Sequence, residues 1–338
     1  MKGEHAAMAR SPVVDIHAHY FPEAYLKLLE AEGEASGIRL NRSNPRGPAI
    51  QIGPILGGPL EAGFWDLDVR RKEMDRQRVE VHALSLTFPM VYWAGSELGV
   101  RLARIVNDAL AEAHTAFPDR FVGLATLPLQ DPPLAKAELE RAARLPGIRG
   151  VYFGTNVNGR ELSHPDFLPI WERVDALKLP VFLHPLNVIG AQRLAPYYLG
   201  NLLGNPFDTT VAAAQLIFGG ILDRFPKLTV CLPHAGGALP YLAGRLDRGH
   251  KVRAECAHLK RKPSTYLRRF TYDTISHAPE PLKYLIKLVG ADRVMIGSDY
   301  CFDLGYERPV EVVTRLSGIS RADQTKILGS TAAKLLHL

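Results

Sequence analysis

Val13-Val14-Asp15-Ile16-His17-Ala18-His19 is a short run rich in β-branched residues that ends in two histidines separated by one residue. In a strand, that separation places both imidazoles on the same face, about 6.5–7 Å apart along the chain. From there the two rings can bind one metal ion. The alternative is a buried strand whose last residues happen to be histidine. The pair therefore predicts a strand and indicates a metal site at its end.

Strand-like and helix-like runs alternate along almost the whole of the remaining sequence, which favours parallel strands joined by helices. The clearest helix is an apolar stripe at three- and four-residue steps between positions 98 and 117. Eight strands are predicted, at Val13–His17, Val81–Leu86, Phe121–Thr126, Gly150–Phe153, Val181–His184, Thr229–Leu232, Phe270–Tyr272 and Val294–Gly297. Eight such units favour an α/β fold of the (β/α)8 TIM-barrel type over a doubly wound sheet. We expect residues 1–338 to form a single barrel domain.

Two longer connections interrupt this pattern and are expected to be insertions at the rim of the barrel. Residues 37–64 are rich in Gly, Pro and Asn, and residues 186–207 carry a Pro-Tyr-Tyr run with further Gly and Asn. Long loops at a barrel rim usually shape the pocket or close over it. For the first insertion, disorder or a contact between subunits is the alternative.

Composition indicates an ordinary water-soluble protein, with 46% hydrophobic and 22% charged residues among 338. No apolar run approaches the ~18 residues of a membrane span, and the amino terminus lacks a secretory signal pattern. The three cysteines show no CxxC spacing, so neither a disulfide framework nor a thiolate zinc site is predicted. A cytoplasmic location is expected.

The net charge of +6 would suit an anionic partner. The one dense basic run lies between residues 251 and 269 and has no aromatic ladder or nucleic-acid motif, so it is interpreted as a solvated face. We expect a small anionic molecule as the ligand, and neither nucleic acid nor membrane as a partner.

Metal-competent side chains gather where a barrel enzyme carries its chemistry, at the carboxyl ends of the strands. They are His17 and His19 at the first strand, His184 at the fifth, His234 after the sixth and Asp299 after the eighth. Three histidines and an aspartate are ligands that zinc accepts with a position left for water. The fourth strand contains no lysine that could bridge a second ion after carbamylation, so one ion is expected.

We assign one divalent ion, zinc or alternatively manganese, to His17, His19, His184 and Asp299. His234 is then the candidate general acid/base, and Asp299 counts as catalytic as well as metal-binding. The alternatives are a structural role for His234 and an ion-pair role for Asp299.

The motifs of this chain resemble those of the amidohydrolase superfamily, in the branch that contains aminocarboxymuconate-semialdehyde decarboxylase. They follow the family order along nearly the whole chain: residues 15–22 (Asp-Ile-His-Ala-His-Tyr-Phe-Pro), Trp65-Asp66, 128–131 (Pro-Leu-Gln-Asp), His184-Pro185, 190–193 (Gly-Ala-Gln-Arg), 234–237 (His-Ala-Gly-Gly), 244–247 (Gly-Arg-Leu-Asp) and 297–300 (Gly-Ser-Asp-Tyr). The resemblance implies a (β/α)8 barrel, the same metal ligands, and His234 as acid/base. It also implies a homodimer in which Arg245 reaches into the neighbouring site to hold a substrate carboxylate.

Two departures from that decarboxylase concern its substrate pocket. Gly57-Gly58-Pro59 replaces a Phe-Arg-Pro segment whose arginine binds substrate, and Leu186-Asn187 replaces Trp-Asp after His184-Pro185. Both argue against aminocarboxymuconate semialdehyde as the substrate. Arg193 and Arg245 are the candidate substrate-binding cations, with Arg46 third, because a guanidinium can bind both carboxylate oxygens. Surface or intersubunit ion pairs are the alternative for each. Cys301 and Phe302 are expected to line the pocket.

Family membership alone does not fix the reaction, because the branch also contains hydratases and hydrolases. Our hypothesis is a metal-dependent, nonoxidative decarboxylase, a carbon–carbon lyase, acting on a small aromatic or unsaturated cyclic carboxylic acid. The alternative is a hydrolase or hydratase acting on a lactone, amide or imide through metal-bound hydroxide. A nonenzymatic metal-binding scaffold is the third possibility and would leave His234 unused.

Overall fold

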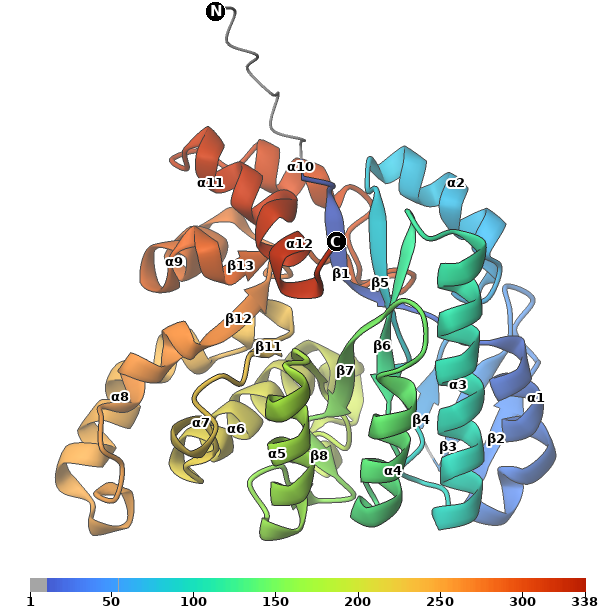
Figure 1. Cartoon of the computed structure of the whole chain (residues 1–338), viewed down its shortest axis with the longest axis horizontal. Helices are drawn as coiled ribbons and strands as arrows, with labels where there is room; N and C mark the ends of the chain where they lie inside the picture. Colours follow the sequence, from blue (N-terminus) through green and yellow to red (C-terminus); the bar gives the residue numbers. More distant parts are fainter. Residues whose placement is uncertain (1–10, 54) are drawn as a thin grey trace, which may run out of the picture.

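The computed structural model describes residues 11–53 and 55–338, so residues 1–10 of the predicted domain and residue 54 of its first insertion lie outside the described part. Its centre is one sheet of eight strands, all pairing in parallel, in the spatial order in which they occur along the chain (Figure 1). The strands are β1 (Val14–His19), β5 (Val81–Ser85), β6 (Phe121–Thr126), β7 (Ile148–Gly154), β10 (Val181–His184), β11 (Val230–Leu232), β12 (Phe270–Asp273) and β13 (Val294–Met295).

Backbone hydrogen bonds join the two edges of this sheet. The N–H of Ile16 donates to the carbonyl of Ile296 (3.0 Å), and the N–H of Asp299 donates to the carbonyl of His17 (2.9 Å). The eight predicted strands are therefore all present, in the predicted order, and the (β/α)8 barrel is confirmed. Strand ends differ from the prediction by a few residues; β1, for example, continues to His19.

Helices surround the strands, and their starts follow local capping chemistry (Figure 1). The carboxylate of Asp66 accepts the N–H groups of Asp68 and Val69, and Asp131 accepts that of Leu134 just after a Pro-Pro pair. The helices are α1 (Glu23–Glu32), α2 (Leu67–Gln77), α3 (Ser96–Ala116), α4 (Pro132–Ala142), α5 (Leu168–Leu177), α6 (Asn205–Phe218), α7 (Ile221–Arg224), α8 (Leu239–Val252), α9 (Pro279–Val289), α10 (Pro309–Thr314), α11 (Arg321–Thr325) and α12 (Thr331–Leu336).

The helical stripe predicted between residues 98 and 117 is confirmed in α3. Leu102, Val106 and Leu110 are wholly buried on one side of this helix, where it packs against β6. The exposed side carries charged residues, as expected for a helix that covers the outside of a barrel.

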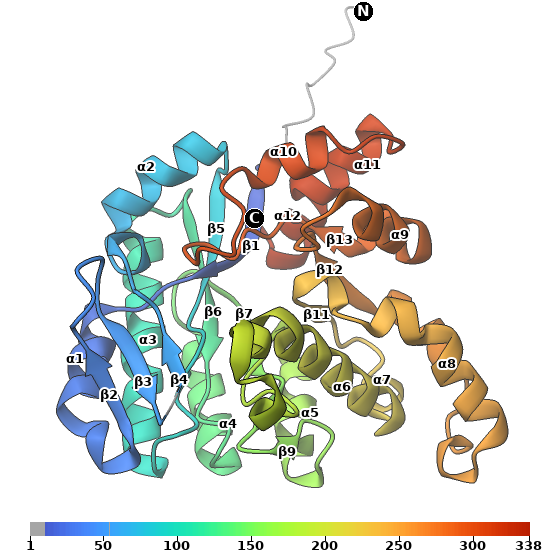
Figure 2. The same cartoon turned by 180° about the vertical axis from the view of Figure 1, so that it is seen from behind.

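The first rim insertion is not the loop that its composition suggested. It folds into a three-stranded antiparallel sheet of β2 (Ile38–Asn41), β3 (Ala49–Ile52) and β4 (Ile55–Gly57), which lies beside α1 and α3 (Figure 2). The Gly47-Pro48 pair precedes β3 and Gly58-Pro59 follows β4, so these pairs mark the ends of short strands. Alternating apolar residues such as Ile38 and Leu40 supply the buried side of the sheet.

The second insertion consists of short helical turns, at Ala191–Leu194, Pro196–Tyr198 and Gly200–Gly204, before α6 begins. Further along the chain, α8 extends away from the body of the molecule in both views (Figures 1 and 2). Within the described ranges, no helix combines the length and the apolar character needed to cross a membrane.

Candidate metal centre and acid/base site

The five side chains predicted from the strand ends converge on one point of the barrel rim. His17 and His19 come from β1, His184 ends β10, and His234 and Asp299 follow β11 and β13. One ligand atom each from His17, His184, His234 and Asp299 lies within 4.8 Å of the other three. His19 belongs to the same cluster, because its Nε2 lies 3.1 Å from Nε2 of His17 and 3.0 Å from Oδ1 of Asp299.

The spacing of these atoms fits a shared divalent ion. Oδ1 of Asp299 also lies 3.4 Å from Nε2 of His17. Ligands held about 2.1 Å from one tetrahedral zinc ion are about 3.4 Å from each other. The donor set, imidazole nitrogens with a carboxylate oxygen, suits zinc and manganese alike.

In each of the three predicted histidine ligands, an oxygen atom lies within hydrogen-bond distance of Nδ1. Nδ1 of His17 donates to Oδ2 of Asp273 (2.8 Å), and Nδ1 of His19 lies 3.3 Å from the Ser85 hydroxyl. Nδ1 of His184 lies 3.0 Å from both the carbonyl of Pro185 and the hydroxyl of Thr87. At His17 and His19 these partners favour protonation of Nδ1 and leave the Nε2 lone pair for a metal, whereas the Thr87 hydroxyl also lies 3.2 Å from Nε2 of His184.

Burial and local charge set protonation states that suit metal binding at His19, His184 and Asp299. Burial lowers the pKa of His19 to about 4 and takes that of His184 well below its ordinary value, so both rings are neutral at pH 7. Burial opposes ionisation of Asp299, but the hydrogen bond with His19 and the nearby His17 outweigh it and lower the Asp299 pKa. For His17, burial lowers the pKa, yet the bond to Asp273 and the charge of Asp299 raise it overall.

His234 differs from the other histidines in how it is held. Its side chain is 13% exposed, and its Nδ1 has no hydrogen-bond partner among the described residues. Its Nε2 lies 3.9 Å from Oδ2 of Asp299, and burial lowers the pKa of the ring. A ring with an unengaged nitrogen beside the cluster can exchange a proton more readily than one locked on both sides.

The backbone is strained where the site residues sit. His234, Ala235 and Asp299 all have positive φ angles, of 52°, 54° and 62°. Each such residue costs on the order of 1–3 kcal/mol and persists only where its surroundings enforce it. The enforcing group at His234 and Ala235 is Asp273, whose carboxylate accepts both N–H groups, at 2.9 and 2.8 Å.

Aromatic side chains form a wall beside the histidines. The ring of Phe302 lies 5.4 Å from that of His19 and 5.0 Å from that of Phe64, and Tyr152 lies 5.9 Å from His184. Phe302 therefore lies where the sequence predicted it, beside the site. Cys301 is half-buried, with its sulfur 3.9 Å from Nη2 of Arg70.

The second insertion directly follows β10, the strand that ends in His184. Burial raises the pKa of Tyr198, and the charges of Asp303 and Asp299 add to this effect. The start of the insertion is tied to the barrel, because the N–H of Ile189 donates to Asp208 (3.1 Å) and Asn156 donates to the carbonyl of Leu186 (2.5 Å).

The predicted substrate-binding arginines lie on exposed elements. Arg193 is in the Ala191–Leu194 turn and Arg245 is on α8, and neither forms an ion pair within residues 11–53 and 55–338. Arg46, the third candidate, is engaged by Glu61, with its Nε 2.8 Å from Oε1. Of the three candidate arginines, only Arg46 is engaged by a carboxylate in the described residues.

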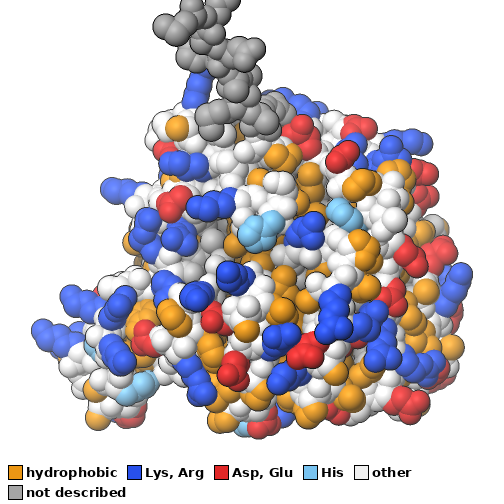
Figure 3. All heavy atoms as spheres, viewed as in Figure 1, with side chains coloured by type: hydrophobic (Ala, Val, Ile, Leu, Met, Phe, Trp, Pro, Cys, Tyr) orange, Lys and Arg blue, Asp and Glu red, His pale blue; other side chains and the backbone are white. Residues whose placement is uncertain are grey.

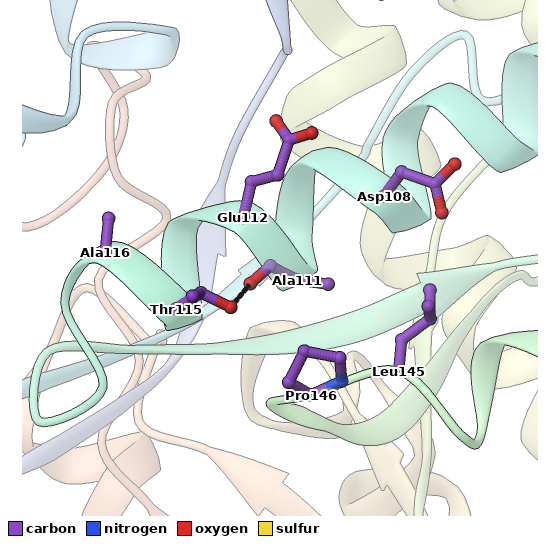
Figure 4. Close-up of a pocket in the computed structure, with 7 residues that line it drawn as sticks. All are labelled: Asp108, Ala111, Glu112, Thr115, Ala116, Leu145 and Pro146. Carbon is purple, nitrogen blue, oxygen red and sulfur yellow. Dashed lines mark hydrogen bonds between the residues drawn. The ribbon is translucent and has the colours of Figure 1, made fainter.

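Two surface features lie outside the site. Lys260, Arg261 and Lys262 of the basic run are exposed, and Figure 3 shows Lys and Arg side chains gathered over the projecting part of the molecule that contains α8. A shallow hollow is lined by α3 and by Leu145 and Pro146 before β7 (Figure 4). Its Asp108 pairs with Arg141, and no histidine lines it, so it offers none of the acid/base chemistry of the rim cluster.

Sequence reasoning missed the residues that hold the ligands in place. Asp273 directly follows the predicted strand Phe270–Tyr272, so the strand-end rule that selected the histidines could have selected it too. Ser85 and Thr87, at and just after the end of β5, follow the same rule. Arg70 gave no such signal: it is wholly buried on α2, where it donates to the carbonyl of His19 and lies 3.2 Å from Nδ1 of His82.

Comparison with known proteins places these features in a wider group. The family model described as "Amidohydrolase" matches residues 14–338. The 2-amino-3-carboxymuconate-6-semialdehyde decarboxylase of Dictyostelium discoideum is 34% identical over 333 residues, which cover 97% of this chain and 92% of that protein.

Two crystal structures of decarboxylases share the fold over almost their full length. The 5-carboxyvanillate decarboxylase LigW from Sphingomonas paucimobilis is 27% identical, with a TM-score of 0.84 over 98% of this chain and 100% of that one. The dihydroxybenzoic acid decarboxylase from Polaromonas sp. JS666, solved with bound manganese and the inhibitor 2-nitroresorcinol, is 28% identical, with a TM-score of 0.80 over 98% of each chain.

Proposed function

The chain belongs to the amidohydrolase family, and from this membership and the geometry of its site we propose that it is a metal-dependent, nonoxidative decarboxylase of a small aromatic or unsaturated cyclic carboxylic acid. The observation that carries the proposal is the convergence of His17, His184, His234 and Asp299, with His19 in the same cluster. The relatives described above are decarboxylases of such acids. The hydrolase alternative is not favoured, because the relatives described above are decarboxylases and not hydrolases.

In this proposal His17, His19, His184 and Asp299 hold one divalent ion. When bound there, such an ion supplies Lewis acidity that orients and polarises an oxygen of the substrate. We take zinc as the first candidate; manganese is the alternative, and it is the metal bound in the Polaromonas enzyme. His19 is assigned as a ligand because it is wholly buried, whereas His234 is nearer to the solvent.

His234 moves the proton. The imidazolium donates the proton on Nε2 to the carbon that bears the carboxylate; the bond from that carbon to the carboxylate then breaks, and carbon dioxide leaves. The electron pair of that bond restores the unsaturated system, and His234 regains a proton from solvent, so one proton is consumed for each carbon dioxide released. Burial holds His234 neutral in the free site, and an anionic substrate beside it favours the protonated ring.

Phe302 and Phe64 supply an apolar face for the flat substrate. Their rings lie 5.0 Å apart next to His19, so a planar acid could lie against Phe302 with its polar groups toward the histidines. This wall supports an aromatic or conjugated substrate over an aliphatic one.

A second copy of the chain would complete the carboxylate site. Gly58 stands where the decarboxylase resembled has its arginine; its φ is +130°, and a Cβ there would lie 3.0 Å from the backbone nitrogen of Leu60 and 3.1 Å from Ala49, so a side chain is disfavoured at this position. Arg245, exposed on the projecting helix α8 without an ion-pair partner in the described residues, is our candidate to hold a carboxylate in the neighbouring subunit of a homodimer. Arg193 is the candidate within the same subunit.

We also propose that residues 1–338 form one domain and that the enzyme is cytoplasmic.

A substrate panel tests the reaction. The purified protein, loaded with zinc or manganese in separate samples, is incubated with 2,6-dihydroxybenzoate, 5-carboxyvanillate, aminocarboxymuconate semialdehyde, and a set of lactones and imides. Carbon dioxide and ring-opened acid are measured separately. We expect carbon dioxide from at least one aromatic acid and none from metal-free protein. Ring opening of a lactone or imide, with no carbon dioxide from any acid, would overturn the proposal.

A further inference from the structure

We propose that Asp273 is a positioning residue that holds the metal ligand His17 and the acid/base residue His234 in register with each other. The inference rests on the proposed function, since it assigns Asp273 a task in that same site. It adds a residue that touches neither substrate nor metal and acts through the two histidines.

Hydrogen bonds occupy all the acceptor directions of the Asp273 carboxylate. Oδ2 accepts from Nδ1 of His17 (2.8 Å) and from the N–H of His234 (2.9 Å), while Oδ1 accepts from the N–H groups of Ala235 (2.8 Å) and Ile275 (3.0 Å). A carboxylate offers about four acceptor directions, so none is left over. With 1% of its surface exposed, Asp273 has little water to compete for these bonds.

The bond to His17 fixes which ring nitrogen faces the cluster. A carboxylate accepts hydrogen bonds and cannot donate them when ionised, so Nδ1 of His17 must carry a proton. The neutral ring then has its lone pair on Nε2, the atom 3.1 Å from His19 and 3.4 Å from Asp299. A hydrogen bond of this kind orients a metal-binding ring and raises its basicity.

The bonds to His234 and Ala235 fix the second histidine. Both residues adopt the left-handed backbone conformation, which is uncommon for side chains other than glycine. Their two N–H groups donate to the carboxylate of Asp273, and these hydrogen bonds stabilise the left-handed turn. Because the same Oδ2 atom binds His17 and His234, a shift of Asp273 would displace both, and their ring centres are 5.3 Å apart.

Asp273→Asn removes this arrangement with little change in shape. An amide NH2 in place of Oδ2 opposes the N–H of His234 and can meet His17 only if Nδ1 gives up its proton, which moves that proton to Nε2. An NH2 in place of Oδ1 opposes two backbone N–H groups. Either orientation disturbs one of the two histidines.

Asp15→Asn is the matched control. Asp15 is a wholly buried carboxylate on β1 outside the cluster of possible metal ligands, and it also accepts two backbone N–H groups, from His17 (3.0 Å) and Ser298 (3.1 Å). It forms no hydrogen bond with an imidazole of the cluster. General disturbance from replacing a buried carboxylate should therefore appear in both variants.

The first test measures zinc and manganese affinity by competition with a chromophoric chelator, which requires no substrate. We expect Asp273→Asn to bind about 10- to 100-fold more weakly than wild type, and Asp15→Asn to stay close to wild type. At saturating metal, kcat of Asp273→Asn should remain lower than that of Asp15→Asn because His234 is displaced. Equal metal affinities in wild type and Asp273→Asn would overturn the inference.

The second test uses the wild-type protein and so does not depend on how the variants fold. In zinc-loaded protein with 15N-labelled histidine, long-range 1H–15N spectra should show the His17 proton on Nδ1 and the metal on Nε2. A metal bound through Nδ1 would overturn the inference alone. A wild-type protein that binds neither metal would instead overturn the proposed function, and this inference with it.

Discussion

At the floor of the site His19 and Asp273 are 0% and 1% exposed, whereas at its rim Tyr197 and Tyr198 are 86% and 57% exposed. Floor side chains reach each other across strands through hydrogen bonds of about 3 Å, as between His17 and Asp273. The predicted substrate-binding residues Arg193 and Arg245 lie on a short turn and on the projecting α8, and they have no ion-pair partner among the described residues.

The contrast separates two tasks. A buried, fully bonded floor holds ligands in a fixed geometry, which metal binding and proton transfer require. An exposed rim with unpaired cations can accept different acids with little effect on the fold. We therefore expect changes at the floor to abolish metal binding or chemistry, and changes at the rim to alter which acid binds and how tightly.

The largest effect is expected from His17→Ala. Loss of one ligand from a three-histidine, one-carboxylate set should remove the metal, and decarboxylation should fall to the level of the uncatalysed reaction. Metal content by mass spectrometry and carbon dioxide release report the two losses. His337→Ala, at an exposed histidine near the end of the chain, is the control and should keep both. An active, metal-loaded His17→Ala protein would contradict the assignment of the floor.

His234→Asn should separate proton transfer from metal binding. We expect full metal content with kcat reduced by about 10²–10⁴-fold, the usual contribution of a general acid or base. The reason is that His234 has an unengaged Nδ1 and greater exposure than His19. Loss of the metal in His234→Asn, with metal retained in His19→Asn, would instead exchange the roles of the two histidines.

Arg245→Ala tests whether the exposed arginine on α8 contributes to substrate binding. A charge-assisted hydrogen bond contributes about 1.5–3 kcal/mol, so KM should rise about 10- to 100-fold, with a smaller change in kcat and none in metal content. Arg248→Ala, also exposed on α8, is the matched control and should leave KM unchanged. If Arg245 serves the neighbouring subunit, mixing Arg245→Ala with His234→Asn should restore activity through mixed dimers. No recovery on mixing, combined with a raised KM, would place Arg245 in its own subunit's site.

The smallest effect is expected from Tyr197→Ala. Its side chain is 86% exposed, so the free energy of unfolding in urea should change by no more than about 0.5 kcal/mol. Tyr152→Ala, at a tyrosine that is 2% exposed beside His184, should lose about 3–5 kcal/mol, as for other large aromatic residues in a core. Similar losses in the two variants would break the distinction between floor and rim.

Much of the floor could be predicted from the sequence because each barrel strand has a recognisable local pattern. Each barrel strand is a short apolar run, and parallel strands place their carboxyl ends at one rim, so His17, His184 and Asp299 could be grouped without coordinates. The rim was harder. Glycine–proline pairs in residues 37–64 suggested loops, yet short strands lie between them, because a three-residue strand such as β4 carries too little pattern to recognise.

Position along a strand is a local property, and residue type and spacing were enough to place the histidines, the aspartate and the barrel around them. Which of these groups touch is a long-range property. His17 and Asp273 are 256 residues apart in the chain and meet at 2.8 Å only because the barrel closes with β1 beside β13 and β12 next to that. Asp273 also accepts the N–H groups of His234 and Ala235, two residues with positive φ, because β11 and β12 are neighbours in the sheet. The local pattern therefore identified the candidate site residues. Contacts between strands that are distant in the sequence determined that the carboxylate of Asp273 holds His17 and His234.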